Sequence, residues 1–245
     1  MRIIDAHMHL GEDLLFCTDD SEDLLLRTMD DHGISALVLQ PGIVARDQRE
    51  AHLRIRRFAD AHPGRVHGLA CFNPLVEDRV YRELVSWAVR ELGFRGIKLH
   101  PGAFCVAPNH PAAEKIYRLA EELGVPVMIH TGNGAPAALP ALCIPVARKH
   151  PDLRIVMAHA GGGYFGPEAL VVAEECPNVY LETSWTPVYD LAAMVSRVGP
   201  RRVMFGADLV PNVPVELAKY RSLGLSEADL EWCLGKTAAE VFGLG

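Results

Sequence analysis

Short apolar runs recur along the chain, and each is followed by a longer stretch in which apolar residues recur every three or four positions. The runs are rich in Val, Ile and Leu, which is typical of buried strands, whereas the longer stretches have the spacing of amphipathic helices. Strands that alternate with helices indicate βαβ units around a parallel sheet. Eight strands are predicted, at residues 2–9, 35–40, 65–72, 94–100, 126–130, 153–159, 179–183 and 202–206.

The helical stretches carry signals for where they start and stop. Ser21 can cap the helix that follows it, and Gly33 can end that helix in the left-handed conformation that glycine adopts freely. Residues 111–123 carry one apolar stripe and stop at Gly124 in the same way. These stripes predict helix faces that pack on a core.

Eight strand–helix units in 245 residues match the size of a (β/α)8 TIM barrel. We expect one domain over residues 1–245, because no Pro-rich, Ser/Gly-rich or low-complexity linker divides the chain. A doubly wound open sheet is the alternative. It usually has a glycine-rich phosphate-binding turn after its first strand, where this chain has His-Met-His-Leu-Gly, so the barrel is favoured.

The formal net charge of -7 comes from acidic and basic residues that are mixed along the whole chain. The only short basic run, at Arg54, Arg56 and Arg57, lies on a predicted helix and is typical of a solvated helix face. Nucleic acid is therefore not expected as a partner. No apolar stretch approaches the roughly 20 residues that span a bilayer, so no membrane partner is expected.

The six cysteines are scattered, without a Cys-x-x-Cys pair. This usage is typical of reduced thiols in the cytosol, and the chain begins without a basic leader segment. We expect a cytoplasmic protein. The cysteines are Cys17, Cys71, Cys105, Cys143, Cys176 and Cys233.

The first predicted strand ends in His7-Met8-His9. Side chains two residues apart on a strand project from the same face, so both imidazoles can reach one metal ion. Two ordinary histidines near an N-terminus are the alternative. Ligands from distant segments decide between the two interpretations.

Polar residues stand at the ends of several other predicted strands. The strand ends of a barrel converge on one face, so these residues share a small space although they are distant in sequence. Five of the eleven histidines lie at such ends. This placement favours a convergent set of ligands. The residues are His7, His9, Lys98, His100, His130, His159 and Asp208.

The order of the motifs resembles the amidohydrolase superfamily. After His-x-His come Gly-Ile-Lys-Leu-His-Pro at 96–101, Val-Met-Ile-His-Thr-Gly at 127–132, Met-Ala-His-Ala-Gly-Gly at 157–162 and Phe-Gly-Ala-Asp at 205–208. The resemblance extends from Ile3 to the C-terminus. It is closest to the branch of metal-dependent hydrolases that includes aminocarboxymuconate-semialdehyde-type decarboxylases.

This resemblance implies a role for each of the strand-end residues. His7, His9, His130 and Asp208 would bind a divalent metal, most simply one Zn²⁺, with Mn²⁺ or a second ion as alternatives. Asp208 would also be the general base for a metal-activated water, and His159 would stabilise the oxyanion. In a two-metal variant His159 would bind the second ion. The structural alternatives are a helix cap for Asp208 and a core histidine for His159.

Lys98 and His100 share one strand face and can both point towards the barrel axis. Lys98 is either a carboxylated bridge between two metals, as in related amidohydrolases, a cation for a substrate carboxylate, or part of an internal ion pair. Arg46, in the loop after the second strand, can bind a carboxylate or remain a solvated charge. We retain Lys98, His100 and Arg46 as substrate-binding candidates. The other loop candidates are Asn73, Phe104, Asn109, Tyr164, Trp185 and Thr186.

Two reactions are compatible with this set of ligands. The first is hydrolysis of an amide, ester or lactone carbonyl in a small molecule, and the second is non-oxidative decarboxylation of a small carboxylic acid. Hydrolysis is favoured here because decarboxylases of this branch are typically longer and carry inserted segments that support dimers. A metal-binding module without turnover is the third alternative, and a homodimer is left open.

Overall fold

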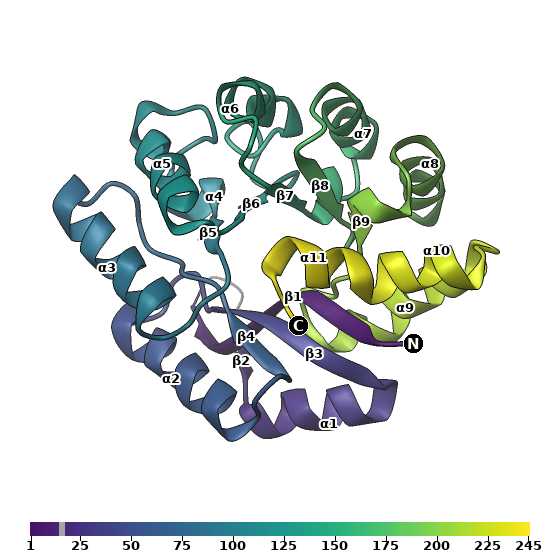
Figure 1. Ribbon diagram of the computed structural model, residues 1–245, viewed down its shortest axis with the longest axis horizontal. Coiled ribbons are helices and arrows are strands. Elements are labelled where there is room, and N and C mark those ends of the chain that lie inside the picture. Colours follow the sequence, from purple (N-terminus) through teal and green to yellow (C-terminus); the bar gives the residue numbers. More distant parts are fainter. Residues whose placement is uncertain (15–17) are drawn as a thin grey trace.

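The computed structural model describes residues 1–14 and 18–245, and it shows strands in a ring with helices around the outside (Figure 1). The predicted (β/α)8 TIM barrel is confirmed. The strands are β1 (Ile3–Asp13), β2 (Thr18–Asp20), β3 (Ile34–Pro41), β4 (Val66–Gly68), β5 (Ile97–Leu99), β6 (Val127–His130), β7 (Ile155–Ala158), β8 (Val179–Glu182) and β9 (Val203–Met204).

Helices follow the barrel strands, as the apolar stripes predict. Ser21 caps the first of them through its side chain, and Gly33 ends it at a φ of 68°. The helices are α1 (Glu22–His32), α2 (Gln48–Ala61), α3 (Asp78–Arg90), α4 (Pro101–Phe104), α5 (Glu114–Leu123), α6 (Cys143–Lys149), α7 (Gly166–Glu175), α8 (Val188–Val198), α9 (Val213–Ser222), α10 (Glu227–Glu231) and α11 (Thr237–Phe242).

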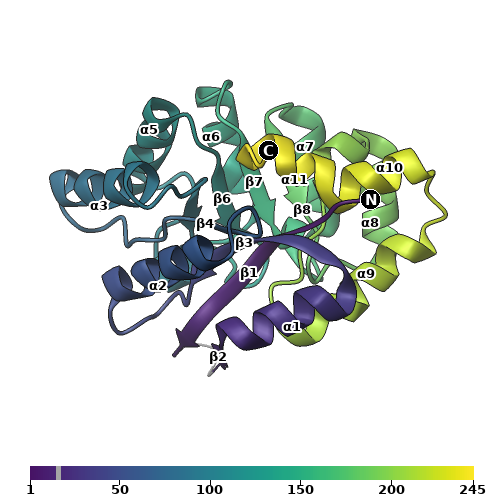
Figure 2. The same ribbon diagram turned by 60° about the horizontal axis from the view of Figure 1, so that its bottom comes forward.

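All eight predicted strands are present as parallel barrel strands, in most cases shortened at their ends. Strand β2 was not predicted. It pairs antiparallel with the end of β1, which continues beyond the other strands (Figure 2). The extra pairing keeps β1 extended past its histidines.

The ring consists of a sheet with the order β2-β1-β3-β4 and a sheet with the order β5-β6-β7-β8-β9. Single bridges join the two sheets, Ala70 to Ile97 on one side and Met8 to Asp208 on the other. The second bridge joins the first barrel strand to the segment after the last one. We call it the β1/β9 seam.

An irregularity in β1 determines which way its histidines point. Ile4 and Ala6 belong to a small cluster inside the barrel, whereas Met8 and Leu10 pack in the larger cluster between strands and helices. The register with β3 shifts between Asp5 and Met8, so the alternation of faces reverses there. As a result, the odd-numbered His7 and His9 occupy the inward face.

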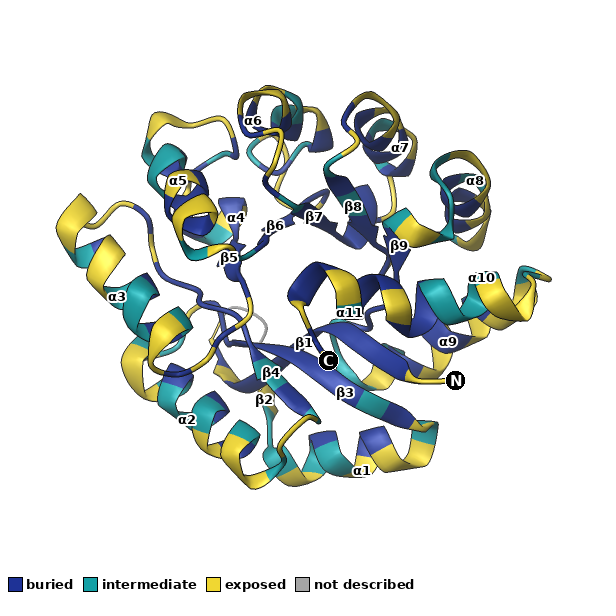
Figure 3. Cartoon of the chain, viewed as in Figure 1, coloured by how far each residue is buried: buried dark blue, intermediate teal, exposed yellow. Residues whose placement is uncertain are grey.

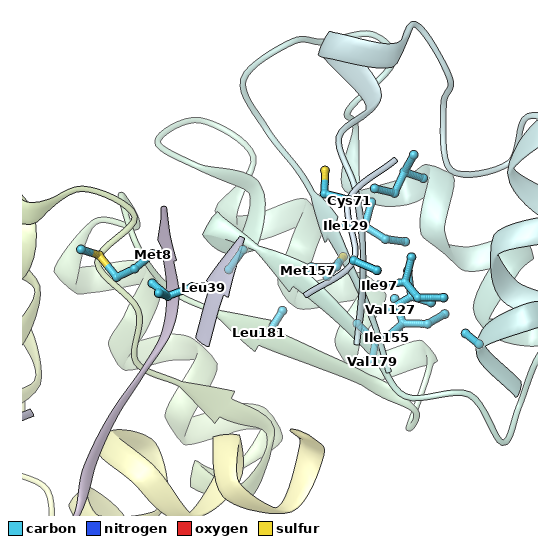
Figure 4. Close-up of a cluster of buried hydrophobic side chains, with 14 of the residues drawn as sticks. Met8, Leu39, Cys71, Ile97, Val127, Ile129, Ile155, Met157, Val179 and Leu181 are labelled. Carbon is cyan, nitrogen blue, oxygen red and sulfur yellow. The ribbon is translucent and has the colours of Figure 1, made fainter. Parts of the chain in front are cut away.

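The large core lies between the strands and the surrounding helices. One row of this core consists of four residues that are in register across neighbouring strands, Ile97, Val127, Ile155 and Val179 (Figure 4). Each buried side chain of this kind contributes about 1.5–3 kcal/mol. The inner faces of the helices are buried and the outer faces exposed (Figure 3).

Helix α11 packs against the cluster inside the barrel, where Phe242 meets Ile4 and Val156 among other apolar residues. With apolar side chains filling this part, the polar residues at the carboxyl ends of the strands are left to form a site. No helix in the described part of the chain is long and apolar enough to cross a membrane. The five described cysteines are free, and Cys17 lies outside the described residues.

Candidate metal centre

Three predicted ligands converge at the β1/β9 seam. The Nε2 atoms of His7 and His9 lie 3.3 Å and 3.2 Å from the same oxygen, Oδ1 of Asp208. One ligand atom from each residue lies within 4.8 Å of the others. Asp208 joins the group because its backbone N–H donates to the carbonyl of His7 at 2.7 Å.

Asp208 does not cap the long helix that follows it. Its φ is 67°, in the left-handed region that aspartate and asparagine tolerate better than most residues. The next long helix, α9, has Asn212 at its N-cap. The indole N–H of Trp185 donates to Oδ2 of Asp208 at 2.8 Å, so the two carboxylate oxygens have separate partners.

The structure places the predicted ligand His130 with a different partner. Its Nε2 donates to the carbonyl of Asn133 at 2.6 Å, and its Nδ1 lies 3.0 Å from Nε2 of His159. Because Asn133 offers only an acceptor, Nδ1 of a neutral His130 accepts from His159. His130 is therefore adjacent to the cluster of His7, His9 and Asp208, but not one of its mutually close members.

His159 is buried at the start of the loop after β7, with a φ of 65°. Its Nδ1 lies 2.8 Å from the hydroxyl of Ser184, and its ring is tilted against that of His7 with the centroids 4.8 Å apart. Contacts to side chains on both nitrogens replace the backbone bonds expected of an ordinary core histidine.

Sequence analysis missed Glu182, which is fully buried at the end of β8. Its carboxylate accepts from Nδ1 of His7 at 2.7 Å and from the backbone N–H groups of His159 and Ser184 at 3.1 Å and 2.6 Å. A usable signal was present, because Glu182 is two residues after the inward-facing Tyr180 on a strand that was predicted.

The substrate-binding candidates lie in three different environments. Lys98 is buried, with Nζ 3.1 Å from Nε2 of His7. His100 lines the cavity described below and stacks on His130 with ring centroids 4.0 Å apart. Arg46 is exposed and pairs with Glu12 at 3.2 Å, outside that lining.

A cavity of about 510 Å³ opens over the cluster. Aromatic rings and glycines dominate its wall, and Trp185 is the loop candidate that contributes to it. The lining residues are His9, Asp13, His100, Gly102, His130, Thr131, Asn133, Gly134, His159, Gly162, Trp185, Asp208 and Leu209.

A family model for amidohydrolases matches residues 4–244. The chain belongs to the amidohydrolase family. The resemblance seen in the motifs is thereby confirmed over nearly the whole chain.

This member of the amidohydrolase family is similar to proteins of known and unknown activity. Gamma-resorcylate decarboxylase of Rhodococcus jostii RHA1 is 24% identical over 92% of this chain and 88% of the relative. A dihydroxybenzoic acid decarboxylase of Polaromonas sp. JS666, solved with manganese and 2-nitroresorcinol, is 18% identical with a TM-score of 0.74, covering 99% of this chain and 97% of the other. An uncharacterised TIM-barrel protein of Bordetella bronchiseptica is 19% identical with a TM-score of 0.73, covering 100% and 99%.

The expectation of hydrolysis is wrong, since the characterised relatives among these are decarboxylases. The expectation of hydrolysis rested on the length of this chain, which was taken as short for a decarboxylase of this branch. The 88% coverage of the Rhodococcus enzyme shows that this chain aligns with most of a decarboxylase, so its modest length does not separate the two reactions. The comparisons support an enzyme that acts on a small molecule.

The lone pairs at the site fit a divalent cation. The ammonium of Lys98 can only donate, so Nε2 of His7 is an acceptor, and it faces a carboxylate oxygen at 3.3 Å. Two acceptors that face one another call for positive charge between them. Nδ1 of His9 is buried without a hydrogen-bond partner among the described residues, so that ring has no second contact on this nitrogen to fix its orientation.

Electrostatics keep the histidines of this site neutral and Asp208 charged. Burial, and then the ammonium of Lys98, hold the pKa of His7 well below its ordinary value. Burial also lowers the pKa of His130 to about 4, and that of Lys98 to about 8. Burial alone would raise the pKa of Asp208, but the rings of His159, His7 and His9 hold it well below its usual range. Neutral imidazoles and a carboxylate are the forms that bind metals.

Proposed function

We propose that this protein is a metal-dependent, non-oxidative decarboxylase of a hydroxylated aromatic carboxylic acid. The observation that carries the proposal is the convergence of His7, His9 and Asp208 at an aromatic-walled cavity, which His9 and Asp208 line. Support comes from the matched relatives, which decarboxylate gamma-resorcylate and a dihydroxybenzoic acid according to their names.

His7, His9 and Asp208 would hold the metal, and His130 is the predicted fourth ligand. Two imidazoles and a carboxylate suit Zn²⁺ or Mn²⁺, and we place Mn²⁺ first because a matched structure contains it. When bound, the ion would supply positive charge to the oxygens of the substrate. To bind it as well, His130 must give up one of its two present hydrogen bonds.

The cavity offers contacts for a flat ring with polar substituents. The stacked rings of His100 and His130 form part of the wall, and Trp185 forms another part. Nδ1 of His100 accepts from the backbone N–H of Ala103 at 3.1 Å, so the proton of the neutral ring is on Nε2. That Nε2–H has no acceptor among the described residues, and a hydroxyl oxygen of the substrate would supply one.

In the proposed reaction the bond between the ring carbon and the carboxylate breaks, and the electron pair stays on the ring. Carbon dioxide leaves and a proton takes its place. We assign the delivery of this proton to Asp208, which lines the cavity. Because Asp208 is charged, it would first take the proton from a hydroxyl of the substrate and then pass it to the ring carbon, so that the product leaves as a phenolate and regains its hydroxyl proton from solvent. The buried His159 holds His130 in place next to the ring.

The test is a decarboxylation assay with metal-free protein and with protein reconstituted with Mn²⁺ or Zn²⁺. We expect carbon dioxide from 2,6-dihydroxybenzoate or a related hydroxybenzoate only with metal, and none from benzoate. Asp208→Asn should abolish release. Stoichiometric metal without release from any hydroxybenzoate would contradict the proposal. A homodimer remains a prediction that light scattering of the same sample would check.

A further inference from the structure

Glu182 lies behind His7, the first metal-ligand candidate, and among the described residues that line the cavity it hydrogen-bonds to His159 alone. Its two carboxylate oxygens accept hydrogen bonds from different donors. Oε2 accepts from Nδ1 of His7, from the backbone N–H of His159 and from the hydroxyl of Ser184, and Oε1 accepts from the backbone N–H of Ser184. The strand ends that carry His7 and His159 are thus tied to β8 through one buried carboxylate.

The tautomer of His7 follows from two contacts on opposite sides of its ring. A carboxylate can only accept, so Nδ1 of His7 is the donor towards Glu182 at 2.7 Å. The Lys98 ammonium can only donate, so Nε2 of His7 is the acceptor at 3.1 Å. Both contacts require the proton on Nδ1, which leaves the lone pair of Nε2 directed at Asp208.

We propose that Glu182 is a positioning residue, which holds His7 in the Nδ1–H tautomer and thereby presents its Nε2 to the metal. The proposal rests on the metal site described under Proposed function. Glu182 acts through His7, and it is not one of the residues that line the cavity. Partners of this kind typically change metal affinity by 10- to 100-fold when they are replaced.

Glu182→Gln is a sharp test because neither orientation of the amide satisfies the site. If its NH₂ group replaces Oε1, it faces the N–H of Ser184. If NH₂ replaces Oε2, it faces the N–H of His159 and donates to Nδ1 of His7, which moves the ring proton to Nε2. The second orientation blocks the nitrogen that would bind metal.

The first measurement uses metal-free protein labelled with ¹⁵N-histidine and long-range ¹H–¹⁵N correlation spectra. His7→Gln assigns the signals. We expect a protonated Nδ1 and an unprotonated Nε2 for His7 in the wild-type protein, and protonation at Nε2 in Glu182→Gln. A wild-type His7 protonated at Nε2 would overturn the proposal without any substitution at Glu182, so it stays testable if that variant does not fold.

The second measurement is the Kd for Mn²⁺ and Zn²⁺, obtained by competition with a chelator. We expect Glu182→Gln to weaken binding by about 10- to 100-fold. Glu216→Gln is the matched control, because Glu216 is also buried and its Oε1 accepts from the backbone N–H of Trp185 without touching His7. Equal affinities of Glu182→Gln and the wild type would overturn the proposal.

Neither measurement uses a substrate, so failure of the decarboxylation assay leaves both results standing. If the wild-type protein bound neither ion, the proposed function would fail, whereas the spectra would still decide the tautomer of His7.

Discussion

The two pairs of histidines at the mouth of the barrel differ in what their ring nitrogens contact. His7 and His9 both direct Nε2 at Oδ1 of Asp208, whereas His130 and His159 contact each other at 3.0 Å. The rings are similarly close, with centroids 5.5 Å apart in the first pair and 4.7 Å apart in the second. Residue type and position at a strand end are therefore insufficient to identify a ligand.

The hydrogen-bond acceptor nearest each pair explains much of the difference in what the ring nitrogens contact. Nε2–H of His130 donates to the carbonyl of Asn133, so Nδ1 of the neutral His130 ring accepts from His159. In the first pair, Nδ1–H of His7 donates to Glu182 on the side of the ring away from Asp208. The acceptor behind His7 leaves the lone pair of its Nε2 facing Asp208, whereas both nitrogens of His130 are engaged in hydrogen bonds. His130 remains a predicted ligand.

The largest expected effect comes from removing the carboxylate that the first pair shares. Asp208→Asn keeps the size of the side chain and the tolerance for a φ of 67°, but it removes the negative charge. We expect metal affinity to fall by more than about 100-fold, beyond the range seen for residues that only support ligands. Competition with a chelator measures this change.

Asp190→Asn is the control for that substitution, since Asp190 is a buried aspartate in α8 outside the cavity lining. It should retain wild-type affinity. An Asp208→Asn protein that kept full affinity would show that the first pair is not a metal site.

Replacing one member of each pair tests the difference directly. His9→Gln should weaken metal binding by more than about 100-fold, and His130→Gln by about 10-fold, because only His9 already faces Asp208. Isothermal titration with Mn²⁺ gives both values. Equal losses would show that His130 leaves its present hydrogen bonds and binds the metal as predicted from the sequence.

A third histidine environment predicts how stability depends on pH. His52 is fully buried, its Nε2 accepts from the backbone N–H of Cys71, and burial lowers its pKa to about 4. The unfolded chain therefore binds a proton before the folded one does as the pH falls. The stabilising contribution is present above pH 6.5, and about 3 kcal/mol of it is lost on the way down to pH 4.

His52→Gln should remove this part of the acid sensitivity. Urea unfolding of metal-free protein at pH 7 and pH 4.5 measures the free energy of unfolding for both proteins. We expect a smaller difference between the two pH values in the variant. Identical differences would contradict the assignment to His52.

The smallest effect is expected at Arg46, which pairs with Glu12 in solvent. Arg46→Ala should change the free energy of unfolding by less than about 1 kcal/mol, as is usual for exposed ion pairs. The KM for a hydroxybenzoate should change by less than about fivefold. A larger rise in KM would support the prediction that Arg46 binds the substrate carboxylate.

The sequence predicts the barrel well because most strands contain a short apolar run, such as residues 126–129, that is buried on both faces of the sheet. The alternation of side chains between the two faces of a strand predicts that Lys98 and His100 both point towards the barrel axis. It does not predict the register shift in β1 or the extra strand β2, since these depend on pairing with β3 and on a returning loop.

The site is predictable only in part. His7, His9 and Asp208 were chosen from strand ends, and the structure brings them together. The partnership of His130 with Asn133 depends on a backbone carbonyl, which side-chain patterns do not report. Glu182 lies inside the predicted strand at residues 179–183, and the sequence does not report that its carboxylate accepts from His7 across the barrel.

The β1/β9 seam also determines when the site can exist during synthesis. Asp5 accepts a hydrogen bond from the backbone N–H of Ala207, and the two residues are 202 positions apart. During synthesis His7 and His9 are made early, whereas Asp208 is made only after the last barrel strand. The proposed metal site is therefore complete only after nearly all of the barrel has been synthesised.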